Sequence, residues 1–512
     1  AIYGSRGANG VVLITTNRGQ KGQTAQFTYN SFSGLATTFS EYPMMNGSQL
    51  AALRDAAGLY PNDGTDEARD VNTDWQGMFY APGLIMNHDM GVSGGGETGN
   101  YNFGLAYYKE EAVIPDQDYQ RISLRGALDQ QIGENIRIGF STNNNYSISN
   151  GNNLGLYGVL SSSPLADPYN EDGTLKRVIR MPLDDQWVYT RESVKSLGDR
   201  WVDHTKSFGS YNSMYAEIAI PGVEGLKFRT NLGLNFNVSN DGEYTGEGVF
   251  SAQPDTQSVA SIGNSQQTRW LIENLLTYDR TFAEKHSLNV VGLFSAEETN
   301  YNRSSIVARD IPSDAFQYYN LGQANGEISI NPDTQVYQKY GLMSVMGRAI
   351  YSYDDRYLFT ATLRTDGSSR LAEGYKWNTY PAASVGWNIK NESFMEPVEW
   401  LNQLKLRAGY GETSNQAIAP YATLGRLGTR PYNFGDENYQ TGYYVTELPN
   451  SELGWEYSTT WNFGIDFGFF NNRLSGTVEY YKTNTNDILL GVSLPSTAGV
   501  GSYTANIGET QN

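Results

Sequence analysis

The sequence lacks cysteine altogether across its 512 residues, which excludes a disulfide framework and any metal site built on thiolates. This absence does not fix the compartment, because cytosolic and bacterial envelope proteins both occur without disulfides. Histidine is nearly absent as well: His88, His204 and His286 stand alone, without the H-E-x-x-H spacing of a zinc site. No apolar run approaches the roughly 18 residues that a transmembrane helix needs. We therefore expect no metal, no cofactor and no membrane-spanning helix.

Positive charge is also in short supply, since 36 Lys and Arg residues face 55 Asp and Glu residues and leave a net charge of −19. This balance repels phosphate backbones, so nucleic acid is excluded as the expected partner. Hydrophobic residues make up only 39% of the chain, whereas Gly (55) and Tyr (37) are abundant. Because apolar residues are diluted along the chain and not collected in helical stripes, the composition favours a protein of many β-strands.

Alternation of apolar and polar residues is the strongest pattern in the chain. Residues Leu226–Val238 read LKFRTNLGLNFNV, which places Leu234 and Phe236 on one face and Asn235 on the other. Soluble sandwiches show alternation too, but their strands average about 5 to 6 residues, whereas a tilted membrane strand needs about 9 to 11. The length of these segments therefore favours an antiparallel transmembrane β-barrel. Similar alternation is found in residues 101–107, 121–129 and 461–469.

The connections between the expected strands alternate in length. Tight turns are expected at 132–135, 221–225, 282–285, 354–355 and 471–472, and long polar segments at about 149–207, 239–265, 301–337 and 413–457. Short turns at one end and long loops at the other are typical of outer-membrane barrels. We count about 15 strands, from Gln26–Gly34 to Leu474–Asn484. Because closed single-chain barrels of this kind have an even number of strands, we expect the chain to stop before the barrel closes.

No motif in the chain predicts catalysis, so we do not expect an enzyme. The opening glycines Gly4, Gly7 and Gly10 match no phosphate-binding pattern and are interpreted as turn and packing positions. Residues Glu171–Gly173 resemble part of a calcium loop, but the first ligand position is Pro168, which favours a turn. Paired carboxylates such as Asp184 with its neighbour are interpreted as solvated loop charges.

Aromatic residues in the long polar segments are the candidate ligand contacts, because such rings stack on sugars or line sites for neutral ligands. For any one of them, an aromatic girdle or ordinary loop packing is the alternative. The candidates are Trp187, Tyr189, Trp201, Tyr318, Tyr319, Tyr432, Tyr443 and Tyr444.

Several stretches, found in family order over nearly the whole chain, resemble one family: the SusC/RagA group of TonB-linked outer-membrane transporters. AIYGSRGANGVVLITTNRG at the start resembles the end of that family's plug domain, just before the first barrel strand. Five further stretches resemble the successive barrel signatures of that family: NHDMGVSGG (87–95), LRTDGSSR (363–370), YPAASVGWNI (380–389), LKLRAGYGETSNQ (404–416) and NSELGWEYSTTWNFGIDFGFFNNRLSGTVEYY (450–481).

The resemblance implies a barrel of about 22 strands with a plug inside it. On that basis residues 1–22 are expected to be the end of the plug with its linker, and residues 23–512 an incomplete barrel. Most of the plug and a TonB-interacting segment are expected before the first residue, and about seven strands after the last. If the plug hangs from the periplasmic side, the first strand runs outward and every short turn lies in the periplasm.

The resemblance also implies a function, which is active import across the outer membrane of a Gram-negative bacterium. The expected ligand is a glycan oligosaccharide, with a peptide as the alternative. Expected partners are outer-membrane lipid, a SusD-like surface lipoprotein at the external mouth, and TonB with ExbB and ExbD at the periplasmic face. A passive porin or adhesin barrel, and a soluble carbohydrate-binding β protein, are the competing hypotheses. The plug-like opening argues against the porin, and the alternating loop lengths argue against the soluble protein.

Overall fold

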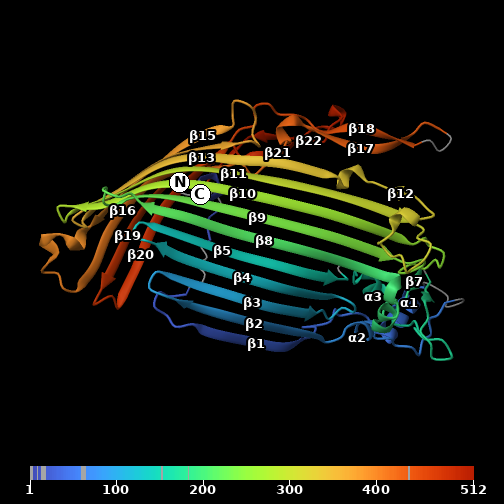
Figure 1. Ribbon diagram of the computed structural model, residues 1–512. Helices are drawn as coiled ribbons and strands as arrows, with labels where there is room; N and C mark the ends of the chain where they lie inside the picture. Colours follow the sequence, from blue (N-terminus) through green and yellow to red (C-terminus); the bar gives the residue numbers. More distant parts are fainter. Residues whose placement is uncertain are drawn as a thin grey trace.

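One antiparallel sheet of 17 strands dominates the computed structural model, which describes residues 4–7, 10–12, 19–58, 65–151, 154–182, 184–435 and 439–512 (Figure 1). Two of the strands are short additions, β12 (Ile328–Ser329) and β23 (Glu509–Gln511). The remaining fifteen form a wall: β1 (Gln26–Ala36), β2 (Gly83–Gly95), β3 (Gly99–Glu111), β4 (Asp118–Ile132), β5 (Ile136–Asn150), β8 (Trp201–Ala219), β9 (Leu226–Thr245), β10 (Val259–Phe282), β11 (His286–Arg309), β13 (Val336–Tyr353), β14 (Tyr357–Ser368), β15 (Trp377–Asn388), β16 (Leu401–Asn415), β19 (Glu456–Phe469) and β20 (Leu474–Asn486).

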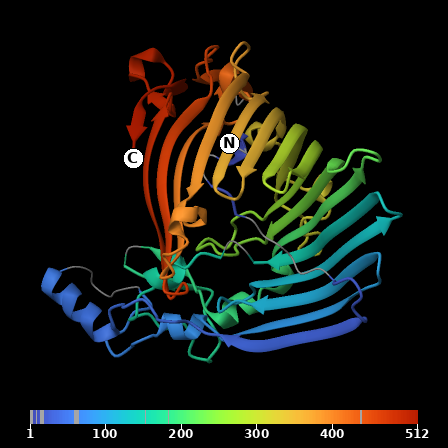
Figure 2. The same ribbon diagram turned by 90° about the vertical axis from the view of Figure 1, so that its left-hand side faces the viewer.

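Each wall strand pairs antiparallel with its neighbours in chain order, from β1 to β20. The predicted fold class and the predicted number of strands are therefore confirmed for the described residues. Seen along the strands, the sheet is strongly curved, and residues 4–7 lie on its concave side (Figure 2).

Several strands are longer than the sequence predicts. β9 has 20 residues, and β10 and β11 have 24 each. The segments expected to be loops at 239–265 and 301–337 shrink accordingly to 246–258 and 310–335. The prediction was wrong here because it ended the strands where the apolar alternation ends, whereas the hydrogen-bonded ladder continues through polar residues that need no apolar face.

The two ends of the wall differ as predicted. The turn end carries 96–98, 133–135, 220–225, 283–285, 354–356 and 470–473, and the loop end carries 37–82, 151–200, 246–258, 310–335, 416–455 and 487–508. The sorting has exceptions, because 389–400 on the turn end is longer than 112–117 and 369–376 on the loop end. Two of these turns carry Asp or Asn with positive φ, 53° and 51° at Asp354 and Asp355 and 56° and 59° at Asn471 and Asn472. Asp and Asn tolerate this left-handed conformation better than most residues do.

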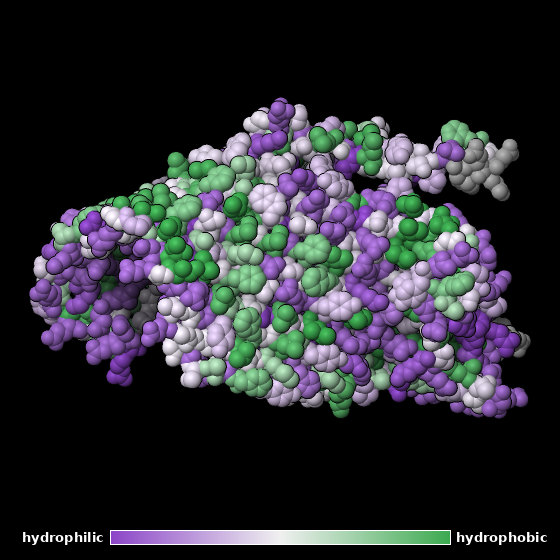
Figure 3. All heavy atoms as spheres, viewed as in Figure 1, coloured by the Kyte–Doolittle hydropathy of each residue, from purple (hydrophilic) through white to green (hydrophobic). Residues whose placement is uncertain are grey.

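The strand pairing places the alternating residues on two faces. Phe236 lies opposite Thr268 of β10, and its neighbour Asn235 lies opposite Arg269 on the other face. The outward side chains remain exposed in the isolated chain, including Leu234 (42%) and Leu124 (52%). Apolar side chains lie over the middle of the outer face, and hydrophilic side chains gather mostly at its two ends (Figure 3). An apolar band between polar ends is the surface that a bilayer requires.

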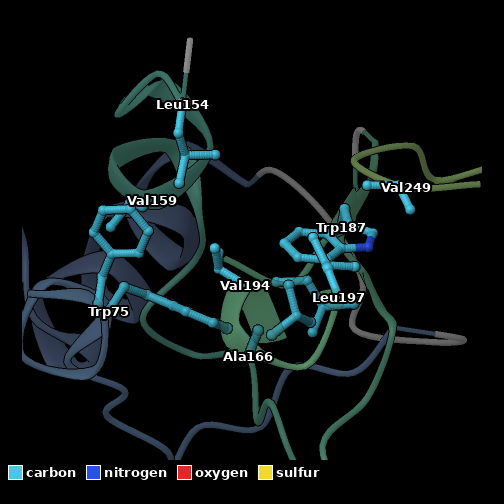
Figure 4. Close-up of a cluster of buried hydrophobic side chains, with 11 residues drawn as sticks. Trp75, Leu154, Val159, Ala166, Trp187, Val194, Leu197 and Val249 are labelled. Atoms are coloured by element: carbon cyan, nitrogen blue, oxygen red, sulfur yellow. The ribbon is translucent and has the colours of Figure 1, made fainter. Parts of the chain in front are cut away.

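Most buried apolar side chains lie at the loop end. Here α2 (Trp75–Phe79), α3 (Tyr157–Ser161) and α4 (Arg191–Lys195) contribute Trp75, Val159 and Val194 to one buried cluster (Figure 4). Phe79 and Val188 of the same cluster are fully buried. A longer helix, α1 (Gly47–Ala57), lies at the same end of the molecule (Figure 1). None of the helices in the described residues is long and apolar enough to cross a membrane. Four further strands, β17 (Arg426–Asn433), β18 (Tyr439–Glu447), β21 (Leu489–Ser493) and β22 (Ser502–Asn506), form a separate small sheet.

Candidate functional site

The start of the chain is fixed to the inner face of the wall through Ser5. The Ser5 backbone N–H donates a hydrogen bond of 2.9 Å to Asp366 Oδ2, although the two residues are 361 positions apart. Asp366 also accepts from Arg364 Nε at 2.7 Å and from the Tyr380 hydroxyl. Arg364 and Asp366 are buried to 1% and 0% exposure. Because an ion pair removed from water is stable only when further hydrogen bonds satisfy it, the N–H from Ser5 completes this cluster.

Gly4 is needed for this contact. Its φ is +59°, and a Cβ added there would lie 2.3 Å from Arg364 Nε and 2.5 Å from Asp366 Oδ2. Any side chain would both strain the backbone and push the segment away from the ion pair. The interpretation of this glycine as a packing position is confirmed.

Arg6 joins the same segment to a second, more open group of charges. Its guanidinium lies 3.2 Å from Glu297 and 3.6 Å from Glu273, and Arg269 reaches the same oxygen of Glu297 at 2.7 Å. The side chain of Arg6 is 32% exposed, so water screens these pairs and each contributes little to stability. The segment is thus held by one buried contact and by weak exposed ones, an arrangement that a pulling force can open.

The loop end holds a cavity of about 600 Å³ with aromatic walls. Trp187, Tyr189 and Trp201 line it, and all three contact a fourth ring, Phe250. Phe250 stacks on Tyr189 with ring centres 5.8 Å apart and meets the edges of the two tryptophans at 5.0 and 5.3 Å. The side chains of Asp184 and Asp185 also line this cavity and are exposed to solvent. Such a mixture of ring faces and oxygen acceptors suits a hydroxyl-rich ligand.

Burial shapes the chemistry of this cavity. Trp187 is only 5% exposed because it also belongs to the loop-end core, and burial raises the pKa of the Tyr189 hydroxyl. Tyr189 therefore stays neutral at physiological pH and acts as a hydrogen-bonding group without charge.

Of the predicted aromatic residues, these three line the cavity. Tyr318 lies in a different buried cluster with Tyr244, and its hydroxyl is 3.0 Å from that of the exposed Tyr319. The remaining three, Tyr432, Tyr443 and Tyr444, are exposed on the β17–β18 hairpin. The predicted aromatic residues therefore lie in three separate groups.

Sequence reasoning missed Phe250 and the partners of the N-terminal segment. Phe250 lies in a different loop from Trp187, and no local pattern links the two. Arg364 and Asp366 belong to the stretch LRTDGSSR, which resembles a family signature, but the signature alone does not say what the charges contact. The sequence did offer one signal for this cluster. Arg364 and Asp366 are two positions apart, on one face of a strand whose other residues are uncharged.

A polar clamp joins two of the loops beside the cavity. Asp66 accepts hydrogen bonds from the Arg180 backbone at 2.7 Å and from its guanidinium at 3.0 Å, and Lys176 lies 3.5 Å away. Burial alone would raise the pKa of Asp66, but the hydrogen bonds from Arg180 and the charge of Lys176 outweigh it and lower the pKa to about 2. Loops 37–82 and 151–200 are thus held together at all ordinary pH values.

The histidines pair with tyrosines. His88 contacts Tyr29, His204 contacts Tyr318 and His286 contacts Tyr351. Across the part of the chain that the structure describes, no three His, Asp or Glu residues are grouped as metal ligands. Residues Glu171–Gly173 lie in a turn closed by a hydrogen bond from Gly173 N–H to the Asn170 carbonyl.

Comparison with known proteins identifies relatives over the whole chain. A family model described as TonB dependent receptor-like, beta-barrel, matches residues 198–512. TonB-dependent receptor P3 of Formosa agariphila is 29% identical over 524 residues, covering 100% of this chain and 50% of the relative. TonB-dependent receptor SusC of Bacteroides thetaiotaomicron is 27% identical over 565 residues, covering 100% and 52%. The chain therefore spans about half the length of the curated relatives it matches.

Solved structures show the same fold. The structure of the RagAB peptide transporter matches with a TM-score of 0.83 at 21% identity, covering 100% of this chain and 60% of the other. The RagAB peptide importer in its closed-closed state matches with a TM-score of 0.86 at 21% identity, with the same coverage. At this level of identity the match concerns the fold.

Proposed function

The chain belongs to the family of TonB dependent receptor-like β-barrels of the outer membrane, and from this premise we propose that it acts in energised import of a large nutrient. The single observation that carries the proposal is the seating of residues 4–7 on the inner wall through Ser5 and Arg6. We assign residues 1–22 to the end of a plug and its linker, and residues 23–512 to the barrel.

In this account TonB pulls on the plug from the turn end, which lies in the periplasm, using energy supplied through ExbB and ExbD. A pull shifts the equilibrium between a closed and an open state only if the two states differ in their contacts. The contacts of Ser5, Arg6 and Gly4 with the wall supply that difference, because they exist only while the segment is seated. No covalent step is required.

The proposed ligand is a glycan oligosaccharide that enters at the loop end. Support comes from the cavity walled by Trp187, Tyr189, Trp201 and Phe250, because aromatic faces stack on sugar rings. A SusD-like surface lipoprotein is the proposed lid at this end, by analogy with the relative named SusC. Such a lid would retain the ligand while the plug moves.

A peptide is the second candidate ligand. The two structural matches are titled as a peptide transporter and a peptide importer, and their fold is this chain's fold. A panel of oligosaccharides and peptides offered as sole nutrient to a deletion strain and to the complemented strain separates the two candidates. Growth that returns only on glycans supports the first candidate, and growth that returns only on peptides supports the second.

Energised import is tested by removing the TonB-interacting segment from the full-length protein. We expect uptake of the ligand to stop while the folded barrel remains in the outer membrane, where its resistance to denaturation before heating reports folding. Uptake that continues without the segment would contradict the proposal and favour a passive porin.

A further inference from the structure

The inner wall contains a second cavity, to which the function proposed above assigns no ligand. It has a volume of about 390 Å³ and lies between Arg6 of the N-terminal segment and the inward residues of β8 to β13. Arg269, Glu297, Tyr340 and Arg370 are among its lining residues. It is separate from the aromatic cavity at the loop end, and the two share no lining residue.

The lining of this cavity is positive although the protein is acidic. Three guanidinium groups, those of Arg6, Arg269 and Arg370, face a single carboxylate, that of Glu297. Glu297 is already shared by Arg6 and Arg269, and Glu273 adds only a distant contact of 3.6 Å to Arg6. In a chain with a net charge of −19, a cavity with an excess of arginine is a local exception that favours an anionic group.

Arg370 is the guanidinium that remains available. Its charge lies 3.9 Å above the ring of Tyr340, and Nη1 donates a hydrogen bond of 3.1 Å to the Ile418 carbonyl. Among the described residues no carboxylate lies within ion-pair distance of Arg370. A guanidinium has five N–H donors, so four remain after the bond to Ile418. The ring and the carbonyl fix its orientation, which favours paired hydrogen bonds to a planar carboxylate.

The cavity continues into a region lined mostly by uncharged polar side chains, with Arg121 as its charged residue. A neighbouring cavity of about 400 Å³ along the same wall shares Tyr211, Asn237 and Gln267 with it. Amide and hydroxyl groups of this kind donate and accept hydrogen bonds without charge. A ligand that lies across both cavities would therefore place one anionic group among the arginines and an uncharged polar chain along the amides.

We propose that the Arg370 cavity binds a carboxylate group of the imported ligand, with Arg370 and Arg269 as its partners. The inference rests on the proposed function and narrows its ligand to one that carries a carboxylate. Two sources share this chemistry, a uronic acid unit of an acidic oligosaccharide and the C-terminus of a peptide. Because Arg6 belongs to the N-terminal segment, withdrawal of that segment removes one of the three guanidinium groups and weakens the hold on the carboxylate.

The test measures equilibrium binding to the full-length protein in detergent by calorimetry. The probes are trigalacturonate, its methyl ester, a free-acid tripeptide and the same tripeptide as its C-terminal amide. The variants are Arg370→Gln and, as a matched control, Arg430→Gln, because Arg430 also lies over a tyrosine ring, 5.5 Å from that of Tyr444, but on the exposed β17–β18 hairpin. Heat-dependent mobility of the barrel confirms that each variant is folded.

We expect at least one free acid to bind at least about tenfold more tightly than its neutral counterpart, as expected for a charge-assisted pair. Arg370→Gln should remove that preference, and Arg430→Gln should leave it unchanged. Preference for trigalacturonate identifies the acidic glycan as the source, and preference for the tripeptide acid identifies the peptide. Equal binding of acid and neutral forms, or equal loss of both in Arg370→Gln, would overturn the inference.

The binding and uptake measurements together distinguish an error in the carboxylate site from an error in energised import. If acid and neutral probes bind equally while uptake still depends on the TonB-interacting segment, the carboxylate site is wrong and the proposed function stands. If the acid preference is found but uptake persists without that segment, the site stands and energised import is wrong.

Discussion

The loop-end core and the inner wall bury side chains in opposite ways. At the loop end Phe79 and Val188 are fully buried among apolar neighbours, and removing their area from water stabilises the contact by about 25 cal/mol per Å². On the inner wall Arg364 and Asp366 are just as deeply buried but are charged, and their burial depends on every hydrogen bond being made. An apolar core can repack after a small substitution, whereas a buried ion pair that loses one partner leaves an uncompensated charge away from water.

The largest effect is expected from Asp366→Asn on the inner wall. The change removes the negative charge that buried Arg364 contacts through Nε and should lower the free energy of unfolding by about 3 to 5 kcal/mol. The measurement is the midpoint of denaturant unfolding of the full-length protein, read from gel mobility. Asp466→Asn is the matched control, because its partner Arg407 is 33% exposed and the loss should be near 1 kcal/mol. Equal losses of unfolding free energy in the two variants would show that burial does not distinguish the two ion pairs.

The loop-end core should respond locally to Trp187→Ala. Loss of this ring costs about 3 kcal/mol, at the low end for a buried tryptophan because one side already faces the cavity. Hydrogen exchange should accelerate in loop 151–200 and remain unchanged in β9 and β10, since the wall does not depend on this core. Tyr157→Ala, at a residue that is 83% exposed in the same loop, should change little. Faster exchange throughout the wall would show that the two regions are coupled.

The outer face sharpens the comparison, because lipid offers a charged side chain no hydrogen-bonding partner. Phe236→Arg places a charge against lipid at a cost of about 2 to 4 kcal/mol near the bilayer midplane. The adjacent change Asn235→Arg points into the interior and should be tolerated, and Leu124→Arg on β4 should behave like Phe236→Arg. The yield of folded protein in bilayers measures the difference. Equal yields for all three variants would contradict the assignment of the faces.

The smallest effect concerns pH at the clamp between loops 37–82 and 151–200. The pKa of Asp66 is lowered from 3.8 to about 2, so its contribution is complete above pH 3.8 and is lost as the pH falls through about 2. Hydrogen exchange of the two loops, measured relative to the intrinsic rate at each pH, should be constant from neutral pH down to that range, and rise only below it. In Asp66→Asn the exchange should be faster at neutral pH and should lack this rise. A rise near neutral pH in the unmodified protein would exclude Asp66 as its cause.

Local patterns were sufficient to predict the wall. The alternation in Leu226–Val238 predicted the two faces of β9, and the polar pair Asp354–Asp355 predicted a tight turn. Both features could be predicted because they depend on contacts between residues that are close in the sequence. The true lengths of β10 and β11 could not be predicted in this way. Their outer parts are polar, and the backbone ladder that extends them leaves no mark on side-chain alternation.

The site was predictable only in part. Trp187, Tyr189 and Trp201 are near one another in sequence, and the structure places them in one cavity. The contact between Ser5 and Asp366 spans 361 residues and depends on the curvature of the whole wall, so no segment of the sequence contains it. Arg370 was missed for the same reason, since its charge matters only beside Arg269 and Arg6.

Movement of the N-terminal segment is the central claim, and one measurement tests it most directly. The chain contains no cysteine, and Ser5 is only 8% exposed, so Ser5→Cys introduces a small, protected thiol in place of a hydroxyl. In cells making the full-length variant, labelling of this thiol by a polar maleimide should be slow and should accelerate when ligand and energised TonB are both present. Phe39→Cys, at an exposed residue that lines none of the cavities named above, should label at one rate throughout. A Ser5→Cys labelling rate that is the same with and without TonB would contradict the account.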